Sequence, residues 1–258
     1  MPENTSPGIH PPVPSIRSVP SLTDDIVHVW LASSGDLTPY VLADLSEVER
    51  RRFDFYLPGR LRSLFAVGAS TLRRAASAYL RCDVDEVIVT RRCRECGGDH
   101  GRPVIENAKD SPLHVSVSHA GDSVLVAFAR HPLGVDVEPI EARATVSSLA
   151  SYVLSREERR HQNDQEALLR TWVVKEAALK ALGRGLAIPM HTFAISDPAD
   201  PRGPWTIGLS TGLVARDLPL GCDYVAALAT ARPSTPALIL GIERLLSIHP
   251  AGRLAVAI

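Results

Sequence analysis

Two acidic side chains alternate with apolar ones in the segment Gly134-Val135-Asp136-Val137-Glu138. Because side chains alternate across a strand, both carboxylates point to one face and both valines to the other. Two carboxylates on one face repel each other unless a cation lies between them, and carboxylates combined with water and phosphate oxygens are typical ligands of Mg²⁺. The alternative is a solvated edge strand with two exposed acids.

A second segment, Trp172-Val-Val-Lys175-Glu176-Ala-Ala-Leu-Lys180, combines an acid with a base. Glu176 and Lys180 are four residues apart, so they share one face of a helix. An exposed pair of this kind contributes little to stability. The other sides of this helix are mostly apolar, which favours a buried cleft lined by Glu176 and Lys180 over a surface ion pair.

The composition limits the classes of protein to which this chain can belong. It has 258 residues, of which 45% are hydrophobic and 22% charged, and its net charge is −1. These values exclude a largely disordered chain and give no basic footprint for nucleic acid. No apolar run reaches the roughly 18 residues that a membrane span needs, the N-terminus lacks a secretory signal, and four cysteines form no disulfide framework. We therefore expect a cytoplasmic enzyme.

The first half of the chain shows a clear order of elements. Residues 1–24 contain six prolines and no apolar periodicity, which indicates an extended tail. A capping box formed by Ser46 and Glu49 predicts the start of a short helix. The patterning further predicts a strand at 26–31, a long helix at 60–80, and strands at 87–90, 113–118 and 123–129.

The second half repeats this order. The string Leu-Ser-x-x-Glu-Arg-Arg occurs at 45–51 and again, displaced by 109 residues, at 154–160. A strand at 133–138 precedes the second copy, and the patterning predicts a helix at 164–182 ended by Gly183, then strands at 193–196, 205–209 and 224–229. One shared heptapeptide can arise by chance, but the matching order favours duplication. We expect an α+β fold of two similar halves, 25–131 and 132–258, with a ligand site between them.

The motifs around these residues resemble those of the Sfp-type 4′-phosphopantetheinyl transferase family. The resemblance spans roughly residues 45 to 230 and rests on four motifs in the same order. They are Gly101-Arg102-Pro103, Ser116-Val-Ser118-His119-Ala-Gly121, Gly134-Val-Asp136-Val-Glu138 and Trp172-x-x-Lys175-Glu176-Ala177-x-x-Lys180-x-x-Gly183-x-Gly185. Family membership implies two α/β halves related by a pseudo-twofold axis, with coenzyme A held between them.

The resemblance also implies roles for individual residues. Asp136, Glu138 and Glu176 match the Mg²⁺ ligands of the family, and Glu176 and Lys180 match its catalytic residues. The implied coenzyme A contacts are Arg51, Arg102, Ser118, His119 and Lys180, and we also expect contacts from His100 and Gly101, which directly precede Arg102. The assignment of Arg51 is sensitive to a shift of one residue, because Arg50 and Arg52 flank it.

The implied reaction transfers 4′-phosphopantetheine from coenzyme A to a serine of an apo acyl or peptidyl carrier protein and releases 3′,5′-ADP. Such carriers belong to polyketide, non-ribosomal peptide or fatty-acid synthases. Size and duplication favour a monomer that accepts several carriers in secondary-metabolite synthesis. Two alternatives remain: a coenzyme A-binding scaffold without transfer, and a Mg²⁺-dependent hydrolase of a nucleotide pyrophosphate.

The segment Cys93-Arg-Glu-Cys96-Gly-Gly-Asp-His100 departs from the family pattern. A Cys-x-x-Cys pair with a nearby histidine is typical of zinc knuckles, but structural zinc takes four ligands. Cys82 or His114 supplies a fourth ligand only if the fold brings it close. The alternative is a tight glycine-rich turn beside coenzyme A. Cys222 precedes a predicted strand and is expected in the core.

Overall fold

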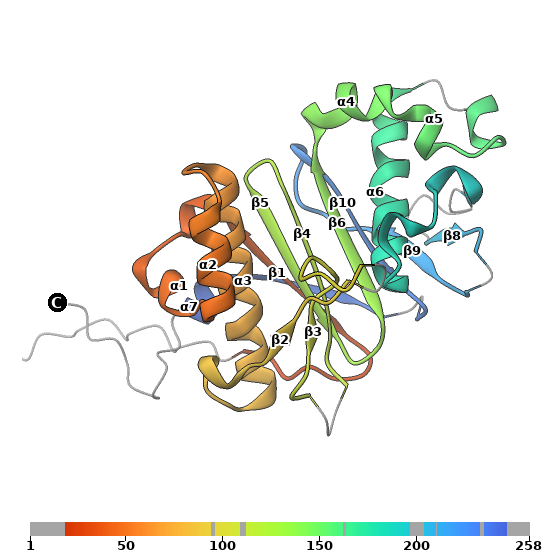
Figure 1. Cartoon of the computed structure of the whole chain (residues 1–258). Helices are drawn as coiled ribbons and strands as arrows, with labels where there is room; N and C mark the ends of the chain where they lie inside the picture. The colour runs from red at the N-terminus through yellow and green to blue at the C-terminus, as the bar shows by residue number, and fades with distance from the viewer. Residues whose placement is uncertain are drawn as a thin grey trace, which may run out of the picture.

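Two sheets lie face to face at the centre of the molecule, and each carries one long helix on its outer side (Figure 1). The computed structural model describes residues 19–93, 96–108, 112–161, 164–196, 204–209, 211–232 and 235–246. Most of the predicted tail at 1–24 therefore lies outside the described residues. The mixture of sheets and covering helices confirms the α+β class.

The regular elements follow one another in two groups. The first group is β1 (Val27–Ser33), α1 (Pro39–Ala43), α2 (Glu47–Phe55), α3 (Arg60–Leu80), β2 (Val89–Thr90), β3 (Val104–Ile105), β4 (His114–Ala120) and β5 (Ser123–Ala129). The second is β6 (Leu133–Pro139), α4 (Arg143–Ser148), α5 (Ala150–Val153), α6 (Gln165–Leu182), β7 (Ile195–Ser196), β8 (Trp205–Ile207), β9 (Val214–Asp217), β10 (Tyr224–Thr230), β11 (Ala237–Gly241) and α7 (Glu243–Leu246).

The strands form two main sheets and one short ribbon. The order of the first sheet is β11-β1-β5-β4, that of the second is β6-β10-β9-β8-β7, and β2 pairs with β3. β11 runs parallel to β1 and so brings a late segment of the chain back to the first sheet. The sequence analysis did not predict β9 or β11. The division of the chain between residues 131 and 132 remains a prediction. β11 follows this division in the sequence but pairs with β1, a strand that precedes it.

Strand alternation builds one apolar core between the two sheets and one between each sheet and its long helix. In β6, Leu133, Val135 and Val137 pack into an apolar cluster between the two sheets, together with residues of β1, β5 and β10. The opposite face of β6 lies against α6, and a Cβ atom at Gly134 would clash with the α6 backbone at Ala177. Asp136 and Glu138 are therefore on the helix side of the strand, as the alternation predicts.

The two capping boxes have different outcomes. Ser46 caps α2, because its hydroxyl accepts from the amide of Glu49 and the Glu49 carboxylate accepts from the amide of Ser46. Ser155 and Glu158 exchange the same two bonds, but only a short 3₁₀ turn, Glu158–Arg160, follows them. The long helix α3 has the predicted bounds, and Gly183 caps α6 in the left-handed region with φ 64°.

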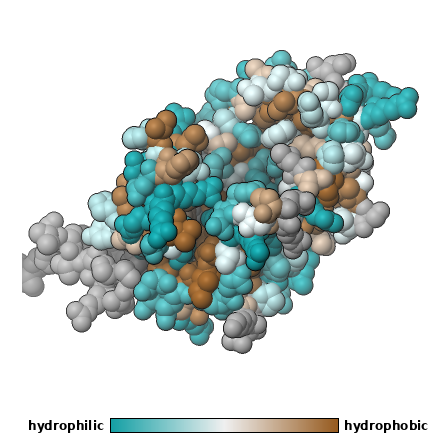
Figure 2. Space-filling model, in the orientation of Figure 1, coloured by the Kyte–Doolittle hydropathy of each residue, from teal (hydrophilic) through white to brown (hydrophobic). Residues whose placement is uncertain are grey.

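The surface on the side shown in Figure 2 is mainly hydrophilic, with separate hydrophobic groups. One such group lies over the connection between α2 and α3, where Phe55, Leu57 and Leu61 are exposed. Among the described residues, none of the helices combines the length and the apolar character required to cross a bilayer.

Candidate active site

Polar side chains from both sheets and from α6 line an open pocket of about 270 Å³. The pocket lies where β4, at the edge of the first sheet, meets β6, at the edge of the second. There the hydroxyl of Ser116 on β4 accepts a bond from the amide of Val135 on β6, at 3.1 Å. The lining residues are Val117, Ser118, His119, Asp136, Glu138, Trp172, Glu176 and Lys180. The pocket thus contains all three predicted metal ligands and both predicted catalytic residues.

Asp136 is the most buried acid of the pocket, with only 3% of its surface exposed. Its Oδ1 accepts hydrogen bonds from the hydroxyl of Ser118 at 2.7 Å and from Lys180 Nζ at 2.6 Å. Its Oδ2 is also buried but has no hydrogen-bond partner among the described residues. A buried carboxylate oxygen without a partner is costly, so this atom of a pocket-lining residue is available as a ligand for a cation.

Glu138 and Glu176 place two more carboxylates near Asp136. Burial, followed by the negative charge of Asp136, raises the pKa of Glu138 to about 7. Burial and the charge of Asp136 also raise the pKa of Glu176. Two acids whose pKa values are raised beside a third carboxylate need a cation to remain ionised together, which is the arrangement expected of a divalent metal site.

Lys180 lines the same pocket and places a positive charge next to these acids. Its Nζ donates to Asp136 and, at 2.9 Å, to the hydroxyl of Ser118. Its side chain keeps 27% of its surface exposed and therefore reaches the open part of the pocket. Trp172, Glu176 and Lys180 are separated by four residues each, so α6 presents all three on one face.

His119 stands at the end of β4, and positive charges surround it. Partial burial and then the charge of Lys180, with smaller effects from Arg52 and Arg91, lower its pKa. The imidazole of His119 is therefore neutral near pH 7, and the positive charges of Lys180, Arg52 and Arg91 are all felt at its position. This part of the pocket suits an anionic group such as a phosphate.

The structure does not bring Arg51 to the pocket. Arg51 lies on the exposed face of α2 and pairs with Glu47 one turn earlier. Its neighbour Arg52 points in a different direction: its guanidinium lies 5.1 Å from the ring of Phe65, and its charge contributes to lowering the pKa of His119. The physical reason is the turn of about 100° per residue in a helix, which separates the directions of adjacent side chains.

The remaining predicted coenzyme A contacts lie beside the pocket rather than in its wall. Arg102 reaches the end of α6, where it donates to the carbonyl of Ala181 at 3.5 Å. Gly101 donates its amide to the carbonyl of Arg91 at 2.5 Å. His100 is exposed, and its Nε2 lies 2.9 Å from Cys96 Sγ. Arg91, which the sequence analysis did not single out, is held by this segment and acts on His119.

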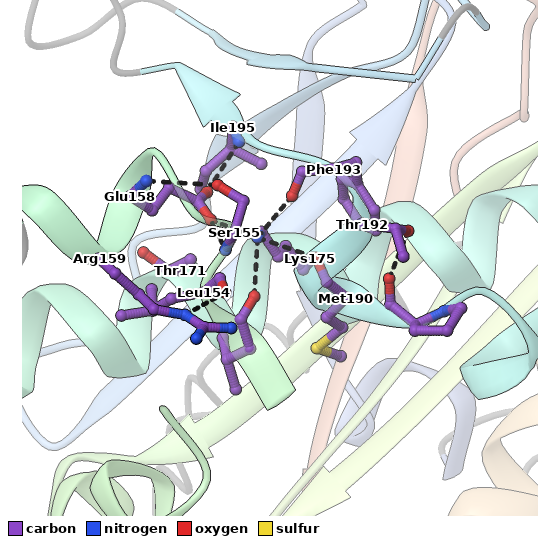
Figure 3. Close-up of polar contacts among 12 residues, drawn as sticks. Leu154, Ser155, Glu158, Arg159, Thr171, Lys175, Met190, Thr192, Phe193 and Ile195 are labelled. Carbon is purple, nitrogen blue, oxygen red and sulfur yellow. Dashed lines mark hydrogen bonds and ion pairs between the residues drawn. The ribbon is translucent and has the colours of Figure 1, made fainter. Parts of the chain in front are cut away.

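Lys175 lies on the same helix as Lys180 but is fully buried, and its polar contacts are drawn in Figure 3. Its Nζ donates to Glu158 Oε2 at 2.6 Å and to the carbonyls of Val153, Met190 and Phe193 at 2.8 to 3.1 Å. Glu158 also accepts the amide of Ile195 at 2.9 Å. All ammonium hydrogens are thus used, and Lys175 is a structural residue that fixes α6.

Comparison with known proteins agrees with this geometry. A family model described as the 4′-phosphopantetheinyl transferase superfamily matches residues 132–227, the segment that contains Asp136, Glu138, Glu176 and Lys180. The 4′-phosphopantetheinyl transferase HetI of Nostoc is 30% identical over 180 residues, which cover 65% of this chain and 73% of HetI. The chain belongs to the 4′-phosphopantetheinyl transferase superfamily.

Other members of the 4′-phosphopantetheinyl transferase superfamily match shorter segments. Gsp of Aneurinibacillus migulanus is 28% identical over 102 residues, and Sfp of Bacillus subtilis is 30% identical over 103 residues; each match covers 38% of this chain. The chain spans 41% of gsp, 44% of Sfp and, at 26% identity over 147 residues, 63% of ffp of Bacillus subtilis. These relatives support the Sfp-type resemblance of the motifs.

Proposed function

We propose that this protein transfers the 4′-phosphopantetheine group from coenzyme A to a serine of an apo acyl or peptidyl carrier protein and releases 3′,5′-ADP. The observation that carries the proposal is the group of three carboxylates with Lys180 in one pocket, at the point where the two sheets meet. Superfamily membership supports the reaction type.

Asp136, Glu138 and Glu176 are the residues that would hold Mg²⁺. The donor set is made of hard carboxylate oxygens, and the unpartnered Oδ2 of Asp136 provides a position for the ion. When bound, Mg²⁺ supplies positive charge that neutralises the pyrophosphate of coenzyme A.

The side chains of this protein have distinct tasks in the proposed reaction. Glu176 takes the proton of the carrier serine hydroxyl, directly or through water. Lys180 stabilises the negative charge that grows on the pyrophosphate oxygens as the serine oxygen bonds to phosphorus and 3′,5′-ADP departs. The acceptor hydroxyl belongs to the carrier, so no nucleophile of this protein is needed.

The nucleotide phosphates of coenzyme A are assigned to the electropositive side of the pocket. Ser118 and His119 line the pocket there, and Arg102 lies beside it at the end of α6. Arg52 and Arg91 act electrostatically on His119. We assign the role expected for Arg51 to Arg52, which is the arginine of α2 whose charge reaches the pocket.

The two halves are further proposed to be copies related by a pseudo-twofold axis. In the first half, the capping glutamate Glu49 binds Arg73 of α3 at 2.5 Å, and Arg73 also donates to the carbonyl of Val87. In the second, the capping glutamate Glu158 binds Lys175 of α6, which donates to carbonyls that follow α6. In each half, a cation on the long helix, Arg73 or Lys175, thus connects the capping glutamate to the segment that follows the helix.

The partner and setting follow from the same proposal. We propose that the protein acts in the cytoplasm as a monomer on carriers of polyketide, non-ribosomal peptide or fatty-acid synthases, with secondary metabolism as the main setting. A duplicated chain contains both walls of the pocket, so it needs no second copy to complete the site.

A panel of apo carrier proteins tests the proposal directly. The protein is incubated with Mg²⁺, coenzyme A and each carrier, and intact mass spectrometry detects addition of the phosphopantetheine group. We expect at least one carrier to be modified, with one 3′,5′-ADP released for each group added. Release of 3′,5′-ADP without a carrier would support the hydrolase instead, and bound but unchanged coenzyme A would support the scaffold.

A further inference from the structure

A second cluster of potential metal ligands lies outside the pocket, in the connection between β2 and β3. Ligand atoms of Cys93, Cys96 and His100 all lie within 4.8 Å of one another, and Cys96 Sγ is 2.9 Å from His100 Nε2. Neighbouring sulfur and nitrogen ligands of a tetrahedral zinc ion lie about 3.5 to 3.8 Å apart, so small side-chain rotations would bring these three atoms to zinc-binding positions. The loop therefore holds two sulfurs and one imidazole ready to share an ion.

The backbone of this loop fixes the ligands in place. The amide of Cys93 donates to the carbonyl of Gly98 at 2.7 Å, and the amide of Gly97 donates to the carbonyl of Cys93 at 3.0 Å. Gly97 has φ 74°, a conformation that favours glycine. The amide of Gly98 donates to Cys96 Sγ at 3.5 Å, a contact that stabilises a thiolate. The glycine-rich turn thus positions the side chains of the ligand cluster.

We propose that Cys93, Cys96 and His100 bind one Zn²⁺ ion and that the fourth coordination position is open to water. Thiolate and imidazole are soft and intermediate ligands that favour zinc, whereas the carboxylates of the pocket favour Mg²⁺. Two thiolates balance the charge of Zn²⁺, and the two thiol protons pass to the solvent on binding. Among the described residues, the cluster includes no fourth histidine, cysteine or acid.

The two other ligands considered from the sequence lie elsewhere. His114 is engaged by Arg102, whose Nη2 lies 3.3 Å from His114 Nδ1. Cys82 follows the end of α3 and packs against the apolar cluster of the first half. Neither belongs to the group formed by Cys93, Cys96 and His100, so a closed four-residue site is excluded for these candidates.

The position of the zinc site gives it a structural task. The ligand His100 is followed directly by Gly101 and Arg102, and the amide of Gly101 is bonded to the carbonyl of Arg91. An ion that closes the loop therefore holds Arg91 and Arg102 at fixed positions beside the pocket. This part of the inference rests on the proposed function, whereas the binding of zinc does not.

Metal content of the full chain is the first test. The protein is purified without chelator and under reducing conditions, and its zinc content is measured by inductively coupled plasma mass spectrometry. We expect about one zinc per chain, with affinity at least about 100-fold weaker in Cys93→Ser and in Cys96→Ser. The matched control is Cys222→Ser, which removes an exposed cysteine outside the cluster and should keep the full zinc content.

Cobalt titration provides a second readout that does not depend on activity. Added to demetallated protein with its thiols shown to be free, Co²⁺ should produce a thiolate-to-cobalt charge-transfer absorption that Zn²⁺ then removes. Absence of this absorption together with absence of bound zinc would overturn the proposal, as would a Cys93–Cys96 disulfide that forms in place of the ion. Asp136→Ala should keep its zinc, so failure of the transferase and failure of the zinc site are distinguishable.

Discussion

Two lysine–carboxylate pairs of the same length lie on α6 and differ in almost every other respect. Lys175 Nζ is 2.6 Å from Glu158, and Lys180 Nζ is 2.6 Å from Asp136. The side chain of Lys175 has no exposed surface and donates to three carbonyls besides the carboxylate. The side chain of Lys180 is 27% exposed and faces two further acids, Glu138 and Glu176, across an open pocket.

The two ion pairs have the same length, so length does not separate a structural lysine from a catalytic one. What separates them is whether hydrogen bonds within the protein satisfy every polar atom around the lysine. Burial lowers the pKa of Lys175, and the bonds to Glu158 oppose that effect, so the charge is kept where no ligand can reach it. The pair of Lys180 and Asp136 leaves Oδ2 of Asp136 unpartnered and leaves the pocket open to a substrate.

The largest effect on stability is expected for Lys175→Met. The substitution keeps most of the length of the side chain but removes the ammonium that donates to Glu158 and three carbonyls inside the core. Loss of one partner of a buried pair costs about 3–5 kcal/mol, so the free energy of unfolding in urea should fall by that amount. The matched control is Arg170→Met, which removes a half-exposed arginine 3.8 Å from Asp217 and should cost under about 1 kcal/mol. An equal, small loss in both variants would contradict a structural role of Lys175.

The opposite pattern is expected for Lys180→Met. Turnover should fall by about 10³-fold, because the charge that stabilises the pyrophosphate in the transition state is gone. The free energy of unfolding should fall by less than in Lys175→Met, because Lys180 is partly exposed and donates to one carboxylate and one hydroxyl, whereas Lys175 donates to four acceptors in the core. Steady-state kinetics and urea unfolding measure the two quantities. A stability loss as large as that of Lys175→Met would remove the distinction between the two lysines.

Part of this contrast could be predicted from the sequence, and part could not. Period-two alternation placed Asp136 and Glu138 on one face, and four-residue spacing placed Glu176 and Lys180 on one helix face, because these relations are local. The cage around Lys175 depends on Val153, Met190 and Phe193, which converge only in the folded chain. Local patterning contains no information about such a convergence.

Other differences have equally concrete causes. The direction of Arg51 and Arg52 depends on the rotation of α2 about its axis, which the capping box does not determine. The second capping box starts only a 3₁₀ turn, and its Glu158 also accepts hydrogen bonds from Lys175 and from the amide of Ile195. Cys222, expected in the core, is exposed. It lies before β10 begins at Tyr224, outside the alternation that buries that strand.

An intermediate effect, on the pH dependence of stability, is expected for Glu138→Gln. Without Mg²⁺, folding raises the pKa of Glu138 from 4.5 to about 7, so between these values the folded protein binds a proton that the unfolded chain has released. Wild-type stability should therefore fall relative to Glu138→Gln as the pH rises from 4.5 to 7, by about 3 kcal/mol in total, and the difference should stay constant above that range. Urea unfolding with a chelator present, with the exposed Glu157→Gln as control, measures this. A difference independent of pH would show that Glu138 is not forced toward its neutral form.

The smallest effect is expected at the electropositive side of the pocket. Arg52→Ala should raise KM for coenzyme A about 10-fold through the loss of one charged contact to phosphate. Arg51→Ala, which removes only the exposed pair with Glu47, should change KM by no more than about twofold. Initial rates at varied coenzyme A concentration measure both. The reverse ranking would return the phosphate-binding role to Arg51.

The most direct test of the account compares transfer by wild-type protein, Asp136→Ala, Glu176→Ala and the double variant at saturating Mg²⁺. Intact mass spectrometry of an accepted carrier gives the rate of phosphopantetheine addition. If the two carboxylates serve one ion, each single variant should lose about 10³-fold or more in turnover. The double variant should be no more than about 10-fold slower than the slower single variant. Turnover by Asp136→Ala within a few-fold of wild type would contradict the account.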